Sequence, residues 1–192
     1  MRVLVACETS GAIRQRMIDA GHDCISCDIL PADDNSPYHY QGDVFDMLDQ
    51  EWDLIIMHPP CTALSLSGNG TYAKGKAKHN ERLEAIVWTV KLWETAKGVS
   101  PRVAMENPMS VIFQYLDCDL VQYVHPWEYG HGEQKKTGFA LYGLPELKPT
   151  DIVEGREQRI WKMGPSPDRW KERSKTYSGI AKAIVDQWTI NP

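Results

Sequence analysis

The apolar segments of this chain are short, and the most apolar of them runs directly into two prolines and a cysteine. Leu54 to Met57 form a continuous apolar run, which His58-Pro59-Pro60-Cys61 follows. A run of this length is typical of a strand that is buried on both faces of a sheet. Because proline fixes the backbone after the strand, the sequence predicts that Cys61 is held rigidly at the strand's end.

Further short strands alternate with helical patterns along the chain. The apolar runs predict strands at residues 3–6, 24–29, 53–57 and 102–106, a short strand ending at 42–44, and a hairpin of 121–124 with 139–142. Helical spacing and turn residues predict helices at 13–18, 80–97, 154–162 and 179–188, with loops at 30–41 and 62–78. In the helix at 80–97, the predicted buried face includes Leu83 and Val87. This alternation favours a doubly wound α/β sheet with its ligand site at the carboxyl ends of the strands.

The composition is that of an ordinary globular domain. The chain has 192 residues, enough for one domain, and its 42% hydrophobic and 24% charged residues exclude a disordered, collagen-like or coiled-coil chain. No apolar run has the length of a membrane-spanning helix, and the first residues lack the pattern of a signal peptide. The five cysteines show no regular spacing and fit a reducing compartment, so we expect a cytoplasmic protein.

Charge is distributed unevenly along the sequence. The net charge is −5, but residues 1–60 carry −8, so residues 61–192 carry +3. Basic residues concentrate at 74–82 and at 156–175, and three aromatic residues accompany the second concentration: Trp161, Trp170 and Tyr177. We expect a polyanion such as a nucleic acid to meet this second half of the chain.

Two residues at predicted strand ends have the chemistry of a catalytic site. Cys61 has the setting of a nucleophile, although an isolated cysteine is more often a small buried apolar residue. Glu106 ends another predicted strand in the phrase Met-Glu-Asn-Pro, where a carboxylate needs a partner. The segment Glu133-Gln134-Lys135-Lys136 supplies cationic donors farther along the chain.

Six motifs then occur in the order found in one enzyme family. They are Cys7-Glu8-Thr9-Ser10-Gly11-Ala12, Pro60-Cys61, Glu106-Asn107-Pro108, Gln134-Lys135-Lys136-Thr137-Gly138, the stretch from Trp161 to Trp170, and Ser178-Gly179-Ile180. With these motifs the chain resembles a DNA cytosine-5 methyltransferase reduced to its catalytic core. The resemblance implies a Rossmann-like sheet of the S-adenosylmethionine-dependent type with helices on both faces, in a single domain over residues 1–192.

The resemblance also implies a mechanism and a set of residues. The Cys61 thiolate would add to carbon 6 of cytosine while Glu106 bonds the base edge, and Lys136 would assist as a third catalytic residue. The cytosine would be flipped out of duplex DNA or would lie in a single strand. The residues implied to meet the DNA or the base are Pro60, Ser65, Lys74, Lys76, Asn107 and Gln134.

S-adenosylmethionine is the implied cofactor. Asp28, at the end of the second predicted strand, is placed to accept hydrogen bonds from the ribose hydroxyls, and Gly11 would allow a close approach of the backbone. Ile29 would pack on the adenine. The complete set of implied cofactor residues is Cys7, Glu8, Thr9, Gly11, Asp28, Ile29, Asp43, Val44, Pro59 and Ser178.

The chain departs from the family pattern in three places. Thr9 and Ala12 partly replace the glycines of the first motif. Lys136 and Gly138 stand where the family has two arginines, and a lysine cannot make an arginine's bidentate contact. The target-recognition region is vestigial, at about residues 144–158. We therefore expect sequence discrimination to be poor, or to come from a homodimer or a specificity partner. The small size suits a phage or mobile element acting in a bacterial or phage-infected host cell.

Other functions remain open at this stage. His58-Pro59-Pro60-Cys61 also resembles the Asn-Pro-Pro-Tyr signature of amino methyltransferases, which modify N4 of cytosine or N6 of adenine. A methyltransferase acting on a free nucleotide or RNA, and an inactive DNA-binding protein, are two further alternatives. Cys24 and Cys27 have the spacing of zinc ligands, but no second pair accompanies them, so we expect no metal site.

Overall fold

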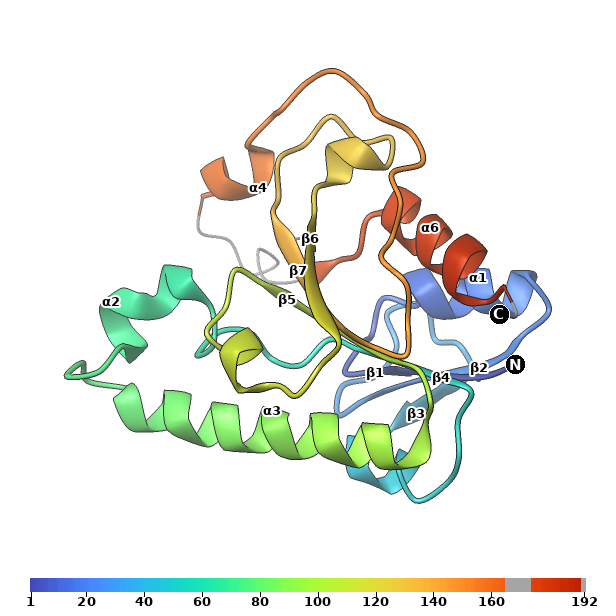
Figure 1. The fold of residues 1–192 in the computed structure, drawn as a ribbon, viewed down its shortest axis with the longest axis horizontal. Coiled ribbons are helices and arrows are strands. Elements are labelled where there is room, and N and C mark those ends of the chain that lie inside the picture. Colours follow the sequence, from blue (N-terminus) through green and yellow to red (C-terminus); the bar gives the residue numbers. More distant parts are fainter. Residues whose placement is uncertain (165–173, 191–192) are drawn as a thin grey trace.

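Seven strands form one sheet in the computed structural model, which describes residues 1–164 and 174–190 (Figure 1). The strands are β1 (Arg2–Ala6), β2 (Asp23–Asp28), β3 (His39–Gln41), β4 (Leu54–Met57), β5 (Val103–Pro108), β6 (Leu120–Val124) and β7 (Thr137–Tyr142). Their order in the sheet is β3-β2-β1-β4-β5-β7-β6. The first five in this order pair in parallel, whereas β7 is antiparallel to both β5 and β6. The predicted α/β class and the hairpin of β6 with β7 are thus confirmed.

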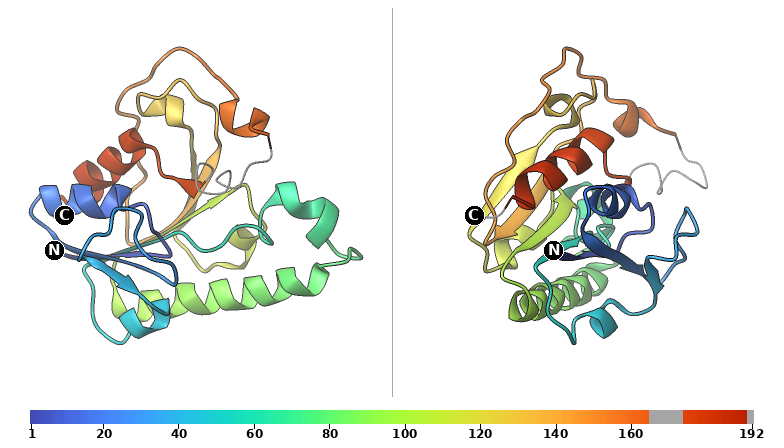
Figure 2. Two further views of the ribbon diagram at one scale, coloured as in Figure 1. Left: turned by 180° about the vertical axis from the view of Figure 1, so that it is seen from behind. Right: turned by 90° about the vertical axis from the view of Figure 1, so that its right-hand side faces the viewer.

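Helices cover both faces of this sheet (Figure 2). Helices α1 (Ala12–Asp19) and α6 (Ser178–Trp188) lie side by side on one face, and the long helix α3 (His79–Val99) lies on the other. Shorter helices are α2 (Asn69–Tyr72) and α4 (Arg159–Lys162), with 3-10 turns at Val44–Met47, Leu66–Gly68, Ile112–Tyr115 and Pro126–Glu128. The prediction of helices on both faces is therefore confirmed.

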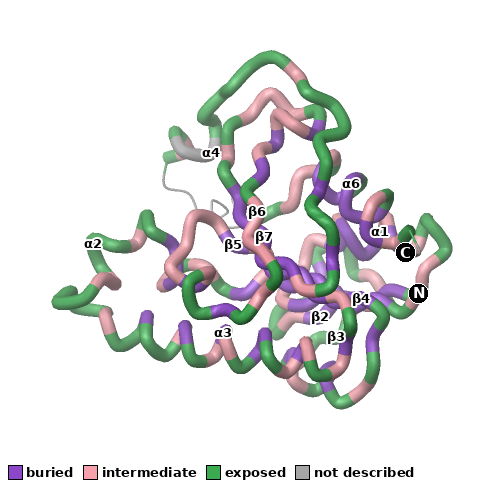
Figure 3. The backbone as a smooth tube through the Cα atoms, in the orientation of Figure 1, coloured by how far each residue is buried: buried purple, intermediate pink, exposed green. Residues whose placement is uncertain are grey.

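Two apolar layers hold the helices on the sheet. Along β4, Leu54 and Ile56 pack toward α1 and α6, whereas Ile55 and Met57 pack toward α3. All four side chains are fully buried, and the central strands form the buried interior in Figure 3. Because successive residues of a strand point to opposite faces, only an uninterrupted apolar run can fill both layers.

Some predicted details are wrong. Leu83 and Val87 of α3 are 47% and 69% exposed, whereas Ile86, Leu92 and Trp93, which belong to the same predicted face, are buried. The helix α3 covers the sheet from one side only, so one stripe of its apolar residues points away from the sheet. The helix predicted at 154–162 is confined to α4.

Residues 125–134 and 150–157 form a small lobe above the carboxyl end of β6. Bridges between Tyr129 and Asp151 and between Glu133 and Glu157 pair the two segments. Backbone hydrogen bonds from Gly130 N–H to the Asp151 carbonyl, at 2.7 Å, and from Gln134 N–H to the Glu157 carbonyl, at 2.8 Å, hold them together. The predicted vestigial recognition region thus forms an extended strap of this lobe.

Within residues 1–164 and 174–190, no helix combines the length and the apolar character needed to cross a membrane.

Replacing Trp188 with alanine is expected to lower the free energy of unfolding by about 3–5 kcal/mol. The Trp188 side chain is 1% exposed, packs edge-on against Phe139 at 5.9 Å, and donates from Nε1 to the Pro145 carbonyl at 2.9 Å. Urea denaturation measures the change. Ile190→Ala is the control, because Ile190 is 68% exposed and its loss should change stability by less than about 0.5 kcal/mol. Equal effects of the two substitutions would contradict this account of the core.

Candidate functional site

Four polar residues meet at one edge of the sheet. Cys7, Asp28, His58 and Glu106 lie at or directly after the carboxyl ends of β1, β2, β4 and β5. These strands are parallel neighbours, so their ends lie at the same edge. In open α/β sheets this edge is where ligands bind. The sequence prediction of a site at this edge is consistent with the observed topology.

Cys61 lies in a turn that the backbone holds firmly. The Cys61 carbonyl accepts from Leu64 N–H at 3.1 Å and from Ser65 N–H at 2.8 Å. Pro59 is buried and Pro60 is exposed, and together they restrict the chain between β4 and the turn. Cys61 is half-buried.

Asn107 joins this turn to the neighbouring strand. The residue is fully buried, and its Nδ2 donates to the Pro59 carbonyl at 3.2 Å. Asn107 was predicted to contact substrate, but its amide group is used to connect the ends of β4 and β5. Its Oδ1 is buried without a hydrogen-bond partner among the described residues.

Glu106 faces a residue that the sequence analysis did not assign to the site. The His58 Nδ1 atom lies 3.3 Å from Glu106 Oε2, and the two side chains are 9% and 17% exposed. Their contact follows from the parallel pairing of β4 with β5, in which Met57 is opposite Met105. Only the pairing register could have revealed this contact, because the two residues are 48 positions apart in the sequence.

The segment after Cys61, residues 62–78, is more structured than the predicted loop. Arg82, in the first turns of α3, is 6% exposed and donates from Nε to the Ala63 carbonyl at 2.6 Å. Its other nitrogens donate to the Ser65 carbonyl at 3.1 Å and to Asn69 Oδ1 at 2.8 Å. One buried guanidinium group thus fixes the segment that carries the nucleophile candidate.

Three predicted substrate residues lie in this same segment. Ser65 is buried, and its hydroxyl accepts from Ser67 N–H at 3.2 Å, so it caps a 3-10 turn. Lys74 and Lys76 are exposed at the tip between α2 and α3. Ser65 therefore lies close to Cys61, whereas the two lysines lie at the surface.

The loop after β1, residues 7–11, turns sharply. Cys7 has φ +58°, in the left-handed region that residues other than glycine seldom adopt. Glu8 is 7% exposed and is turned inward, where it accepts from Ser10 Oγ and, at 3.0 Å, from Gly11 N–H. Glu8 thus stabilises the shape of the loop.

The structure itself favours glycine at position 11. It has φ +68°, and a Cβ atom there would lie 2.3 Å from an Arg14 nitrogen and 2.9 Å from Asp34 Oδ2. The space beside Gly11 is therefore filled by an ion pair of the protein. The ion pair of Arg14 with Asp34 could not be predicted from the sequence, because β2 separates the two segments to which these residues belong.

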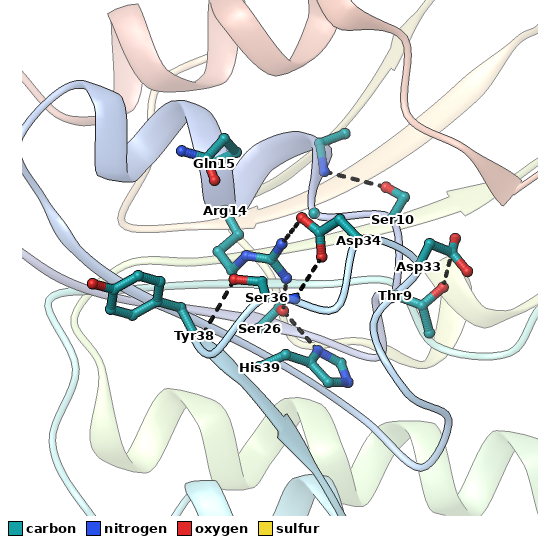
Figure 4. Close-up of polar contacts among 12 residues, drawn as sticks. Thr9, Ser10, Arg14, Gln15, Ser26, Asp33, Asp34, Ser36, Tyr38 and His39 are labelled. Carbon is teal, nitrogen blue, oxygen red and sulfur yellow. Dashed lines mark hydrogen bonds and ion pairs between the residues drawn. The ribbon is translucent and has the colours of Figure 1, made fainter.

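Arg14 ties the loop after β2 to helix α1 (Figure 4). Its side chain is fully buried, pairs with Asp34, and donates to Ser26 Oγ at 2.7 Å. Ser26 Oγ lies 2.8 Å from His39 Nδ1, which extends the network to β3. The same loop contacts the β1 loop through Thr9, whose carbonyl accepts from Asp33 N–H at 2.9 Å.

The remaining predicted cofactor residues lie along the ends of β2 and β3. Asp28 Oδ1 accepts from Leu30 N–H at 2.9 Å, and its Oδ2 has no hydrogen-bond partner among the described residues. Ile29 is 74% exposed beside it. Asp43 caps the turn at Val44–Met47 by accepting from Phe45 N–H at 3.0 Å, and Val44 is buried.

Lys136 and Gly138 stand where the family has two arginines; Lys136 directly precedes β7 and Gly138 lies within it. Lys136 is exposed, with Nζ 4.6 Å from the centroid of the Tyr123 ring. Gln134 is also exposed and lies in the lobe. A Cβ atom on Gly138 would lie 2.6 Å from the Phe113 ring, so no arginine fits there without displacing that ring.

Ser178 lies at the start of α6 beside His131. His131 Nε2 accepts from Gly179 N–H at 3.1 Å and lies 3.2 Å from Ser178 Oγ. His131 therefore holds the start of α6 against the lobe. Of the three aromatic residues that accompany the second basic concentration, Tyr177 donates to Glu133 Oε2 at 2.5 Å, whereas Trp170 and the side chain of Trp161 lie outside the described residues.

Burial raises the pKa of four thiols of the chain. Burial raises the pKa of Cys24 and of Cys27 to about 12, and it raises the pKa of Cys7 as well. Burial also raises the pKa of Cys118, with a smaller contribution from Asp119. Thiols with raised pKa values remain protonated at neutral pH and are poor nucleophiles. In the parts of the chain that the structure describes, no cluster of three or more potential ligands is arranged around a metal site.

Comparison with solved structures identifies the fold. The chain aligns with a protein described as a DNA modification methyltransferase encoded within a prophage (E. coli), with TM-score 0.52 and 16% identity over 86% of this chain and 55% of that one. It aligns with Entamoeba histolytica methyltransferase EhMeth at TM-score 0.54 and 15% identity, over 82% of this chain and 57% of that one. For the S. pombe Dnmt2 methyltransferase the TM-score is 0.50 and the identity 14%, over 76% of this chain and 51% of that one.

The chain therefore has the fold of these methyltransferases and spans just over half the length of each. No family model matches the chain, and no curated protein matches it.

Replacing Asp34 with asparagine is expected to lower the free energy of unfolding at pH 7 by about 1–3 kcal/mol, because it leaves a buried Arg14 without its counter-charge. Burial opposes ionisation of Asp34, but hydrogen bonds from Arg14 and from Ser36 N–H outweigh it and lower the pKa of Asp34. The stabilisation is therefore complete above about pH 4 and is lost as the pH falls through the folded-state pKa.

Denaturation at pH 7 and at pH 3 measures this difference. The exposed Asp49→Asn is the control and should change stability little. The ion-pair account is wrong if the two substitutions have equal effects, or if the Asp34→Asn effect is undiminished in acid.

Limited treatment with iodoacetamide at pH 8 is expected to modify Cys61 before Cys24 and Cys27. The thiol pKa near 12 and the burial of the latter two suppress their reaction. Peptide mass spectrometry measures the order, and the urea-denatured protein, in which all five cysteines should react alike, is the control. Native modification of Cys24 as fast as that of Cys61 would contradict the assignment.

Proposed function

We propose that the chain is a DNA (cytosine-5) methyltransferase that uses S-adenosylmethionine and a Cys61 nucleophile. The observation that carries the proposal is that Cys61 follows β4 while Glu106 lies near the carboxyl end of the adjacent parallel strand β5. Asn107 links these two strand ends through the Pro59 carbonyl. A thiol and a carboxylate on one rigid edge are the two groups that addition to a cytosine ring requires.

The described residues fit S-adenosylmethionine. The open carboxylate oxygen of Asp28 suits the ribose hydroxyls, the exposed Ile29 suits the adenine face, and the turn at Asp43 and Val44 adjoins both. The sharp loop after β1, with Cys7, Thr9 and Gly11, would hold the methionine portion of the cofactor. In this proposal, Pro59 and Ser178 also contact the cofactor. When bound, this cofactor supplies an electrophilic methyl group.

The chain's own residues account for the activation of the base. The Cys61 thiolate forms a bond to carbon 6, which makes carbon 5 nucleophilic. Glu106 accepts a hydrogen bond from the N4 amino group and supplies a proton to N3, which neutralises the charge that the addition places on N3. After methylation, a water molecule takes the proton from carbon 5, the bond from carbon 6 to Cys61 breaks to regenerate the thiolate, and N3 returns its proton to Glu106.

DNA is the proposed substrate because of both chemistry and fold. The base must leave the duplex or be single-stranded to meet Cys61. Lys74 and Lys76, exposed beyond the Cys61 turn, are suited to phosphate contacts. One protein with the same fold is described as a DNA modification methyltransferase. We assign target selection to a specificity partner or a second copy, and the setting to the cytoplasm of a bacterial or phage-infected cell.

An amino methyltransferase is the second candidate, favoured by one observation. His58 occupies the first position of the Asn-Pro-Pro-Tyr pattern, and its Nε2 is buried without a partner among the described residues. Cys61, at the tyrosine position of that pattern, provides no ring to stack on a base, so this candidate ranks second.

Incubation of unmodified DNA with the protein and S-adenosylmethionine is expected to give 5-methylcytosine. Cys61→Ala should lower the yield at least about 10³-fold, because no other thiol can replace the nucleophile. Nucleoside mass spectrometry measures the product. Cys118→Ala is the matched control, since Cys118 is also half-buried but lies before β6.

Three outcomes would overturn the proposal. N4-methylcytosine or N6-methyladenine from both wild type and Cys61→Ala would indicate an amino methyltransferase. Methylation of RNA or of free nucleotides, with DNA left unmodified, would change the substrate. Binding of S-adenosylmethionine without any product would indicate an inactive binding protein.

A further inference from the structure

His58 is held in a fixed position next to the proposed active site. It directly follows β4, and its N–H donates to the Ala6 carbonyl at 2.9 Å, which continues the pairing of β4 with β1. Two prolines follow it, so the backbone on both sides of His58 is restrained. The ring is consequently presented toward β5 from a rigid element.

The ring contacts the carboxylate that the proposed function requires. His58 Nδ1 lies 3.3 Å from Glu106 Oε2, and both side chains are largely buried, at 9% and 17% exposure. Among the described residues, no other hydrogen-bond partner of the Glu106 carboxylate is found. A carboxylate with so little solvent contact needs a donor, and His58 is the residue that supplies it.

We propose that His58 is a positioning residue for Glu106. Its Nδ1–H donates to Oε2 and fixes the carboxylate, which leaves Oε1 for the N3 and N4 edge of the base. This inference rests on the proposed function, because the orientation matters only if Glu106 binds the base. The motif resemblance assigned no role to His58.

The second ring nitrogen supports a ligand-facing role. When Nδ1 carries the proton of a neutral imidazole, Nε2 is an acceptor. Nε2 is buried and has no hydrogen-bond partner among the described residues. A buried acceptor without a donor is destabilising, so a histidine retained only for packing would be poorly suited to this position. We therefore place the ring in the ligand pocket and outside the apolar core.

Two substitutions separate the hydrogen bond from the packing of the ring. His58→Asn keeps a donor, because the asparagine Nδ2 can occupy nearly the place of Nδ1. His58→Leu keeps an apolar side chain of moderate size and has no donor. His22→Leu is the matched control, since His22 lies before β2, at the opposite edge of the sheet.

The assay is steady-state methylation of cytosine-containing oligonucleotides, single-stranded and duplex, with S-adenosylmethionine. His58→Leu is expected to lower kcat by about 10–100-fold, the size expected from losing a hydrogen bond to a charged group, with cofactor Kd changed less than about twofold. His58→Asn should recover most of kcat. Glu106→Gln combined with His58→Leu should be no slower than Glu106→Gln alone, because both act through one group.

Two kinetic outcomes would overturn the inference. Equal losses of kcat in His58→Asn and His58→Leu would indicate that His58 contributes only by packing. A cofactor Kd weakened in parallel with kcat would place His58 in the cofactor site. Circular dichroism and calorimetric titration with S-adenosylmethionine establish that each variant is folded.

A second measurement does not depend on activity. Two-bond ¹H–¹⁵N correlation spectra of the wild type report which His58 nitrogen is protonated, and Glu106→Ala reports whether that state depends on the carboxylate. The expected result is an Nδ1-protonated ring whose signals shift in Glu106→Ala. An Nε2-protonated, unshifted ring refutes the positioning role even if 5-methylcytosine forms. If the spectra are as expected but no 5-methylcytosine forms, the contact between His58 and Glu106 is established. The proposed function is then refuted, and with it the positioning role of His58.

Discussion

Strand β4 is the constraint on which the rest of the structure depends. It is paired in parallel on both edges, with β1 and β5, and its four side chains are buried in two separate apolar layers. An apolar run in this position can neither shift by one residue nor twist away without exposing one layer. The pairing therefore fixes where the chain leaves the sheet, and it places Cys61 after the end of β4 and Glu106 near the end of β5.

Buried polar side chains then hold the loops that the strands leave behind. Arg82 binds the backbone after Cys61, Asn107 binds the Pro59 carbonyl, and Arg14 with Asp34 ties the loop after β2 to α1. Each of these groups would be destabilising if unpaired, so each favours one conformation of its loop. The edge of the sheet is thus rigid where chemistry is proposed, and the lysines at residues 74 and 76 remain exposed outside it.

Sequence patterns predicted the parts of this structure that local periodicity controls. The strand-length apolar runs, the two-sided helix cover and the shared edge of the polar strand ends all follow from such patterns. The contact of His58 with Glu106 could not be predicted, because it depends on the register of two strands 48 residues apart. The exposure of Val87 also required tertiary information, since an apolar stripe on a helix does not say how wide the covered surface is. Asp34, which lies with Arg14 beside Gly11, could not be predicted as a neighbour of Gly11 either, because it is far from Gly11 in the sequence.

The central claim is that Cys61 forms a covalent bond to carbon 6 of a cytosine. Its most direct test is mass spectrometry of the protein after incubation with S-adenosylmethionine and an oligonucleotide containing 5-fluorocytosine. Fluorine at carbon 5 cannot leave as a proton does, so the adduct should accumulate, and peptide mapping should locate the modified base on Cys61. An adduct on another residue would contradict the claim. So would the absence of any adduct under conditions in which the same oligonucleotide with ordinary cytosine becomes methylated.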